Sequence, residues 1–404
     1  MNVLLSLGLI LLLALLAGHL AKAFRLPEVT GYILAGVAVG PSGLRWINHE
    51  NISALSVFSE VALGLILFSI GSAFEFQRVR SLGRALARIT GIESLLAGGL
   101  VFAAMLAFGQ SWQVAFLLGA IAMETAAAST LMVLRECGAS GPLTDTVIGV
   151  IGLNNILCLT AFSVAAASVD LAAHVRAEGF VLSALYESGF PLVWQLVGSA
   201  ALGYLMGLLI ASWAPKVIEH GETLILLIGC LLLCVGIAVF LELSTLVASL
   251  AVGATMANLS PESRRLYQAL SRSDPPFYAV FFVIAGADLN LGLLTTVGPL
   301  GAVYVICRAA GKFLGARIGT RGAGVPAQVQ RLLGFALLSQ AGLAVGLTLA
   351  VSRRFPDLAP QVVTIVLAAV IIHEIIGPLG ARFAVLRSGE ARQKNAQEMI
   401  ASPA

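Results

Sequence analysis

Long apolar segments recur along the whole chain and constrain its fold more than any other feature. A helix needs about 20 mostly apolar residues to cross the ~30 Å hydrocarbon core of a bilayer. Charged and Pro- or Gly-rich stretches divide the chain into thirteen expected spans: 2–21, 28–44, 52–73, 85–108, 112–134, 143–168, 190–213, 222–240, 243–258, 276–291, 294–316, 329–351 and 359–382. Merging 222–240 with 243–258 gives twelve. The sequence therefore predicts an all-α polytopic membrane protein.

Composition excludes several other classes of protein. Of the 404 residues, 58% are hydrophobic and 11% are charged, whereas soluble domains carry about 25% charged residues. A net charge of +3, from 24 basic and 21 acidic residues, is too balanced for a protein that binds nucleic acid. The five cysteines lack the spacing of metal ligands, and we expect Cys230 and Cys234 to pack in the core. No nucleophile–base pair indicates an enzyme, and we expect no cofactor.

The loop charges predict the orientation. With thirteen spans and the N-terminus outside, eighteen Lys and Arg residues fall in inside loops, and four, Arg45, Arg176, Arg353 and Arg354, fall outside. Cytoplasmic loops carry such an excess of positive charge. We therefore expect the C-terminus in the cytoplasm. The first apolar segment has no basic residue before it, so we interpret it as a retained helix rather than a signal peptide.

An odd number of spans allows an inverted repeat of six helices on each side of a linker helix. The repeats would cover about 1–168 and 222–382 and the linker about 190–213, within a transmembrane domain of 1–386 followed by a polar tail of 387–404. The corresponding spans 112–134 and 329–351 both carry small and polar residues near mid-membrane, at 123–128 and 339–344. These stretches either pack helices closely or interrupt two helices that cross and bind an ion.

Ionisable residues at bilayer depth cost about 2.5–3.5 kcal/mol each and mark functional positions. The expected spans contain seven of special interest: Glu60, Glu93, Glu124, Arg308, Lys312, His373 and Glu374. Arg308 and Lys312 share one helix face, so both need anionic partners. We expect Lys312 to pair with Glu124 or Glu374. Glu60 and Glu93 fit packing or salt bridges better than transport, and His373 fits a core position.

Glu124 is the strongest candidate for an ion-binding group, because it lies in the middle of an expected interruption. Its carboxylate can hold a cation, release it on protonation, or form a fixed bridge to Lys312. Asn154 and Asn155 can ligate a cation or hydrogen-bond between helices, but an amide cannot carry a proton. The predicted site comprises Glu124, Thr125, Asn154, Asn155, Arg308, Lys312, Gln340 and Glu374, with Na⁺ or K⁺ on Glu124, Asn154 and Asn155.

Several motifs, in order along the chain, resemble one family of transporters. They are Leu26–Gly36 (LPEVTGYILAG) with Gly40-Pro41-Ser42, Glu60–Gly64 with Phe68–Gly71, Phe282–Asp288, Arg308 with Gly311-Lys312, and His373-Glu374 with Gly377-Pro378. Together they are similar to the Kef-type monovalent cation:proton antiporter-2 family, and the resemblance covers essentially the whole chain.

The resemblance implies thirteen helices in two inverted repeats, in which a core bundle with crossed, interrupted helices moves against a dimerisation bundle like an elevator. It implies a homodimer in the bacterial inner membrane that exchanges Na⁺ or K⁺ for H⁺. Kef-type relatives often carry a cytoplasmic nucleotide-binding domain. Only a short polar tail follows Arg382, so we expect such regulation to come from a separate cytoplasmic subunit.

One departure from the family pattern leaves three hypotheses about function open. Members of the family usually carry an aspartate where this chain has Asn154-Asn155. Either the exchanging carboxylate has moved to Glu124, or the scaffold carries another solute, such as an anion near Arg308 and Lys312, or the protein is a sensor that does not transport.

Overall fold

The computed structural model describes residues 3–24, 26–47, 49–72, 76–178, 193–273, 275–289, 292 and 298–391, and its regular structure in these ranges is helical. The expected tail beyond 391 and the start of the linker helix at 190–192 lie outside the described residues. The helices are α1 (Val3–Ala23), α2 (Glu28–Val39), α3 (His49–Ser72), α4 (Phe76–Ala107), α5 (Trp112–Ala122), α6 (Ala127–Glu136), α7 (Pro142–Glu178), η1 (Trp194–Gly198), α9 (Ser199–Trp213), η2 (Ala214–Lys216), α10 (His220–Phe240), α11 (Thr245–Leu259), α12 (Ser263–Ser273), α13 (Pro275–Asp288), α15 (Gly298–Thr320), α16 (Ala327–Ala336), α17 (Gly342–Arg354) and α18 (Ala359–Ser388).

Each expected span contains a helix or a pair of helices. By length and composition, seven helical segments among the described residues suit a membrane crossing: Val3–Ala23, Gly83–Ala107, Trp112–Glu136, Pro142–Ala172, Trp194–Lys216, His220–Phe240 and Ala359–Ser388. The spans 222–240 and 243–258 do not merge, because α10 ends at Phe240 and a turn with Glu242 at a φ of 55° separates it from α11. The sequence reading missed α12, a short polar helix whose Leu266 and Leu270 are buried.

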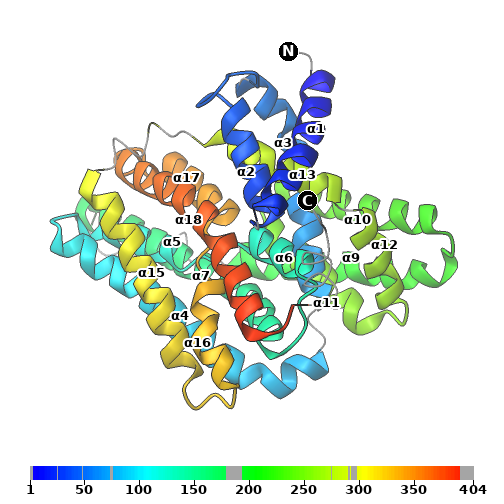
Figure 1. The fold of residues 1–404 in the computed structure, drawn as a ribbon. Coiled ribbons are helices and arrows are strands. Elements are labelled where there is room, and N and C mark those ends of the chain that lie inside the picture. The colour runs from blue at the N-terminus through cyan, green and yellow to red at the C-terminus, as the bar shows by residue number, and fades with distance from the viewer. Residues whose placement is uncertain are drawn as a thin grey trace.

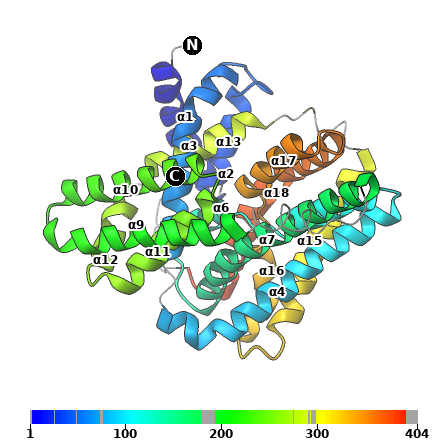
Figure 2. The same ribbon diagram turned by 180° about the vertical axis from the view of Figure 1, so that it is seen from behind.

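The helices form two groups, which Figures 1 and 2 show from opposite sides. In the core bundle, α4, α5, α6 and α7 pack with α15, α16, α17 and α18. In the scaffold bundle, α1, α2 and α3 pack with α9, α10, α11, α12 and α13. The two bundles meet mainly where α6 and α18 of the core lie against α2 and α3 of the scaffold. Cys230 and Cys234 are free and buried in the scaffold bundle, as predicted.

A glycine face brings α15 against α4 in the core bundle. Gly311, Gly315 and Gly319 recur every four residues and therefore share one face of α15. A methyl group on Gly311 would lie 2.5 Å from the Cα of Ala97, and one on Gly315 would lie 2.5 Å from the Cα of Glu93. Only hydrogen fits at these points, so the backbones approach closely. This approach places Lys312 beside Glu93.

We expect Gly315→Leu to destabilise the protein by at least about 1–3 kcal/mol, because the larger side chain must push α15 away from α4. The measurement is the temperature at which half of the detergent-solubilised protein stops eluting as a single species. Gly99→Leu on α4 is the matched control, since a methyl group there has no neighbour within 4 Å. Equal thermal stability of the two variants would contradict this account of the glycine face.

Candidate functional site

Two helices of the core bundle are interrupted, and the interruptions meet. The first break, 123–126, separates α5 from α6, and the second, 337–341, separates α16 from α17. The N–H of Ala126 donates to the carbonyl of Ser339 at 3.0 Å. The hydroxyl of Thr125 donates to the carbonyl of Leu337 at 3.5 Å. The alternative of interrupted helices is therefore confirmed over that of continuous, closely packed ones.

Arg308 holds the second break and the end of the first. Its guanidinium donates to the carbonyls of Leu338 at 2.7 Å, Ser339 at 3.0 Å and Glu124 at 2.5 Å. The break leaves these carbonyls without helical partners, and the C-terminal end of a helix carries partial negative charge. The direct hydrogen bonds of Arg308 therefore go to backbone carbonyls, and the carboxylate expected near it is that of Glu124, with which it interacts electrostatically.

Lys312 pairs with Glu93, which corrects the expectation that it pairs with Glu124 or Glu374. The Nζ atom of Lys312 lies 2.5 Å from Oε1 of Glu93, and both side chains are fully buried. The same Nζ donates to the carbonyl of Met123 at 2.6 Å and to the hydroxyl of Thr125 at 2.7 Å. Glu93 therefore has the structural salt-bridge role predicted for it. The hypothesis of a fixed bridge between Glu124 and Lys312 is wrong.

Asn154 links α7 to this salt bridge and to the first break. Its Nδ2 donates to Oε2 of Glu93 at 3.3 Å, to the hydroxyl of Ser94 at 2.7 Å and to the carbonyl of Met123 at 2.8 Å. Its Oδ1 is buried and has no donor. The amide group thus uses its N–H groups to support the structure and keeps its oxygen available.

Glu124 is 1% exposed and lies in the first break. The backbone N–H of Ala341, at the start of α17, donates to its carboxylate. Its second oxygen, Oε2, is buried without a donor. The N-terminal end of a helix favours negative charge and the C-terminal end favours positive charge. The carboxylate of Glu124 therefore lies at the N-terminal end of α17. Arg308 and Lys312 contact carbonyls just after the C-terminal ends of α16 and α5.

The remaining predicted residues contribute further oxygen atoms. Gln340 is fully buried in the second break, where its Nε2 donates to the hydroxyl of Tyr304 at 2.9 Å and to the carbonyl of Ile121 at 3.3 Å. Its Oε1 has no donor. Neither carboxylate oxygen of Glu374 meets a donor in hydrogen-bonding geometry, and the same holds for Oδ1 of Asn155. Among the described residues, unpartnered oxygens thus gather at and beside the two breaks.

The structure also shows where two ionisable residues outside the predicted site lie. Glu60 is exposed on α3 in the scaffold bundle. His373 is 2% exposed, and its Nδ1 lies 2.8 Å from the carbonyl of Ala369 in the preceding turn, as expected of a core histidine. Sequence reasoning missed Tyr304, which holds Gln340. Its position four residues before Arg308 and eight before Lys312 puts all three on one face of α15, which is the signal that could have found it.

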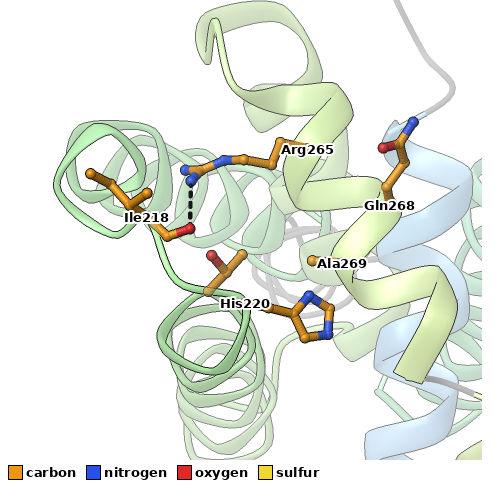
Figure 3. A pocket seen from close by; sticks show the side chains of 6 residues that line it. Ile218, His220, Arg265, Gln268 and Ala269 are labelled. Carbon is orange, nitrogen blue, oxygen red and sulfur yellow. Dashed lines mark hydrogen bonds between the residues drawn. The ribbon is translucent and has the colours of Figure 1, made fainter.

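A pocket of about 150 Å³ lies in the scaffold bundle, at the start of α10 and beside α12. Figure 3 shows Arg265 reaching across to the carbonyl of Ile218, to which it donates at 3.3 Å. The same guanidinium donates to the carbonyl of Ala214 at 2.7 Å and pairs with Glu262 at 3.1 Å. Because Arg265 uses its donors within the protein, we assign no ligand to this pocket.

Comparisons with known proteins agree on one family and one fold. The family described as "Sodium/hydrogen exchanger, transmembrane" matches residues 8–386. A subunit of an ammonium/H⁺ antiporter, AmhT from Alkalihalophilus pseudofirmus, is 24% identical over 333 residues, which are 82% of each chain.

Two solved structures of the sodium proton antiporter MjNhaP1 from Methanocaldococcus jannaschii share the fold. One, at pH 8, has a TM-score of 0.72 at 16% identity and covers 95% of this chain and 98% of its own. The other, determined by electron microscopy, has a TM-score of 0.76 at 15% identity and covers 97% of this chain and 100% of its own.

Proposed function

Because the chain belongs to the sodium/hydrogen exchanger family, a family of multi-pass membrane proteins, we propose that it exchanges a monovalent cation, Na⁺ or K⁺, for protons. The observation that carries this proposal is the set of buried oxygens without donors at and beside the two breaks, on Glu124, Gln340 and, from α7, Asn154. An alkali cation takes oxygen ligands, and transporters bind coupling ions where helices unwind.

Glu124 is the group that exchanges the two ions. Exchange requires one group that holds either the cation or a proton, so that the two compete. Asn154, Asn155 and Gln340 can ligate a cation but cannot take up a proton, and a charged lysine offers only donors. Glu124, with its free oxygen, lies in the same break as Thr125 and directly after Met123, whose carbonyl accepts from Asn154. Its carboxylate therefore binds the cation while it is ionised and releases the cation when it takes up a proton.

Movement of one bundle against the other gives alternating access in this proposal. The ion site lies within the core bundle, and polar contacts at the end of α6 join it to the scaffold. Arg135 donates to the hydroxyls of Tyr278 at 2.9 Å and Tyr267 at 3.4 Å, and the N–H of Glu28 donates to Glu136 at 2.8 Å. An elevator-like displacement must break these contacts on one side of the membrane.

The finer assignments are also part of the proposal. The ordered motifs support the Kef-type branch and a homodimer in the bacterial inner membrane, and the loop charges support an N-terminus outside with a cytoplasmic C-terminus. The ammonium/H⁺ antiporter relative is named as a subunit, which supports a separate cytoplasmic regulatory subunit here and adds ammonium to the cations worth testing. An anion substrate has less support, because Lys312 is paired with Glu93 and Arg308 is bound to carbonyls.

The experiment is a flux assay in proteoliposomes that contain a pH-sensitive dye. Gradients of Na⁺, K⁺ or ammonium are imposed in turn, and we expect at least one of the two alkali cations to move protons in the opposite direction. Proton movement driven only by an anion gradient would replace this function with anion transport. A protein that moves no protons under any gradient would point to a sensor.

Asn155→Asp tests whether position 155 can hold the carboxylate that exchanges the two ions. Asn155 is 8% exposed on α7, directly after Asn154, at the position where the resembled family carries an acid. We expect Asn155→Asp to restore cation-driven proton flux in a Glu124→Gln background, since aspartate can hold either ion. Asn155→Gln in the same background is the control and should stay inactive. Restoration by both variants, or by neither, would contradict this interpretation of the position.

A further inference from the structure

Exposed arginines lie at one end of the core bundle, where α4 begins, α15 ends and α16 begins (Figure 1). They are Arg84, Arg88, Arg317, Arg321 and Arg331, which together we call the arginine face. Near the end of α15, a methyl group on Gly319 would lie 2.9 Å from the Cα of Ile89 in α4. One on Gly322 would lie 3.5 Å from Nη1 of Arg88. The start of α4 and the turn after α15 therefore contribute to one surface.

The arginine face has no counter-charge within the part of the chain that the structure describes. The stretches 83–92 and 313–336, which supply its residues, contain no Asp or Glu. None of the five arginines forms an ion pair or a hydrogen bond with a described residue. Three other basic residues predicted on the same side of the membrane do have acidic partners, in the pairs Lys22–Glu28, Arg265–Glu262 and Arg382–Glu136. The arginine face is thus available to an anion from outside the chain.

The arginines continue two apolar stripes on the outside of the core bundle. Leu314 of α15 is 50% exposed, and Arg317 and Arg321 follow it by three and seven residues on the same side of the helix. Leu95 of α4 is 63% exposed, and Arg88 precedes it by seven residues. Exposed apolar side chains of membrane helices contact lipid chains. Seven residues span about 10 Å of helix, so long arginine side chains at these points reach the level of the lipid headgroups.

We propose that the arginine face binds the phosphate groups of anionic phospholipids. A guanidinium donates paired hydrogen bonds to a phosphate and is only weakly hydrated. Anionic lipids of the cytoplasmic leaflet attract basic clusters that adjoin membrane helices, and the loop charges predict that this end of the protein is cytoplasmic. Lipid headgroups fit better than an acidic soluble protein, because the arginines continue the stripes that face the lipid. The inference goes beyond the proposed function, since it concerns binding and needs no transport.

The test adds phosphatidylglycerol to the delipidated full chain in a neutral detergent. The measurement is the temperature at which half of the protein stops eluting as a single species. We expect phosphatidylglycerol to raise this temperature more than phosphatidylcholine with the same acyl chains. The difference should shrink between about 0.1 M and about 1 M salt, because the Debye length falls from about 10 Å to about 3 Å.

Two outcomes of this comparison would contradict the proposal. Equal stabilisation by the two lipids at low salt would overturn it, because the headgroup charge would then play no part. Stabilisation by inorganic phosphate, added alone at the same concentration, would assign the face to a free anion and overturn the lipid assignment. Either result would leave the proposed cation exchange intact, since transport is not measured.

The variant Arg88→Gln/Arg321→Gln locates the binding. Each basic residue near an anionic surface strengthens the attraction about fivefold, so the phosphatidylglycerol concentration for half of the effect should rise about tenfold or more. Arg88→Lys/Arg321→Lys keeps both charges and should retain most of the response. The matched control, Lys216→Gln/Arg264→Gln, removes two exposed charges from the scaffold bundle and should respond like the wild type. A double-glutamine variant of the arginine face that responds like the wild type, or a control that loses as much, would overturn the inference.

Discussion

Replacing Glu124 by glutamine should reduce cation-driven proton flux to the level of liposomes without protein. The glutamine keeps the size of the side chain and an oxygen for the N–H of Ala341, so the break should persist. It cannot take up a proton, so the competition between cation and proton is lost. The measurement is the initial rate of dye response after a cation gradient is imposed, with protein content per liposome held equal.

Glu222→Gln is the matched control, because it makes the same chemical change at an exposed residue of the scaffold bundle. It should transport like the wild type. Elution of Glu124→Gln as the same species as the wild type would establish that the protein is folded. Flux that persists in a folded Glu124→Gln protein would remove Glu124 from the mechanism and shift the exchanging role to Glu374.

Breaking the pair between Glu93 and Lys312 should cost about 3–5 kcal/mol of stability, because the remaining partner becomes an unpaired buried charge. We expect Glu93→Gln and Lys312→Met each to show this loss. The double variant should recover most of it, since it leaves no isolated charge. Thermal stability in detergent, measured for the wild type, both single variants and the double variant, gives the coupling energy.

The ion pair of Arg354 and Asp170 provides the comparison, since its side chains are 40% and 22% exposed. Its coupling energy should not exceed about 1 kcal/mol, the usual limit for exposed pairs. Single variants of Glu93 and Lys312 that are as stable as the wild type would show that this buried pair does not stabilise the core bundle.

Several local features follow from the sequence because they depend on neighbouring residues. The apolar spans indicated membrane helices, since spanning length is set by the bilayer. The small and polar residues at 123–128 and 339–344 marked the two interruptions, which the structure places at 123–126 and 337–341. Even so, these residues alone were equally compatible with close packing. The first break contains no Gly or Pro, so nothing local forces it.

The sequence by itself determined the class of protein, the positions of the apolar helices and the set of polar residues that a bilayer makes costly. Only the tertiary structure decided which of those residues meet. Lys312 pairs with Glu93 rather than Glu124 because Gly311 and Gly315 let α15 approach α4 at that point. Arg308 and Asn154 hold the carbonyls of the breaks, so the interruptions persist through partners that are distant in the chain. The buried backbone groups must be satisfied somewhere, and only the packing of both halves of the chain determines where.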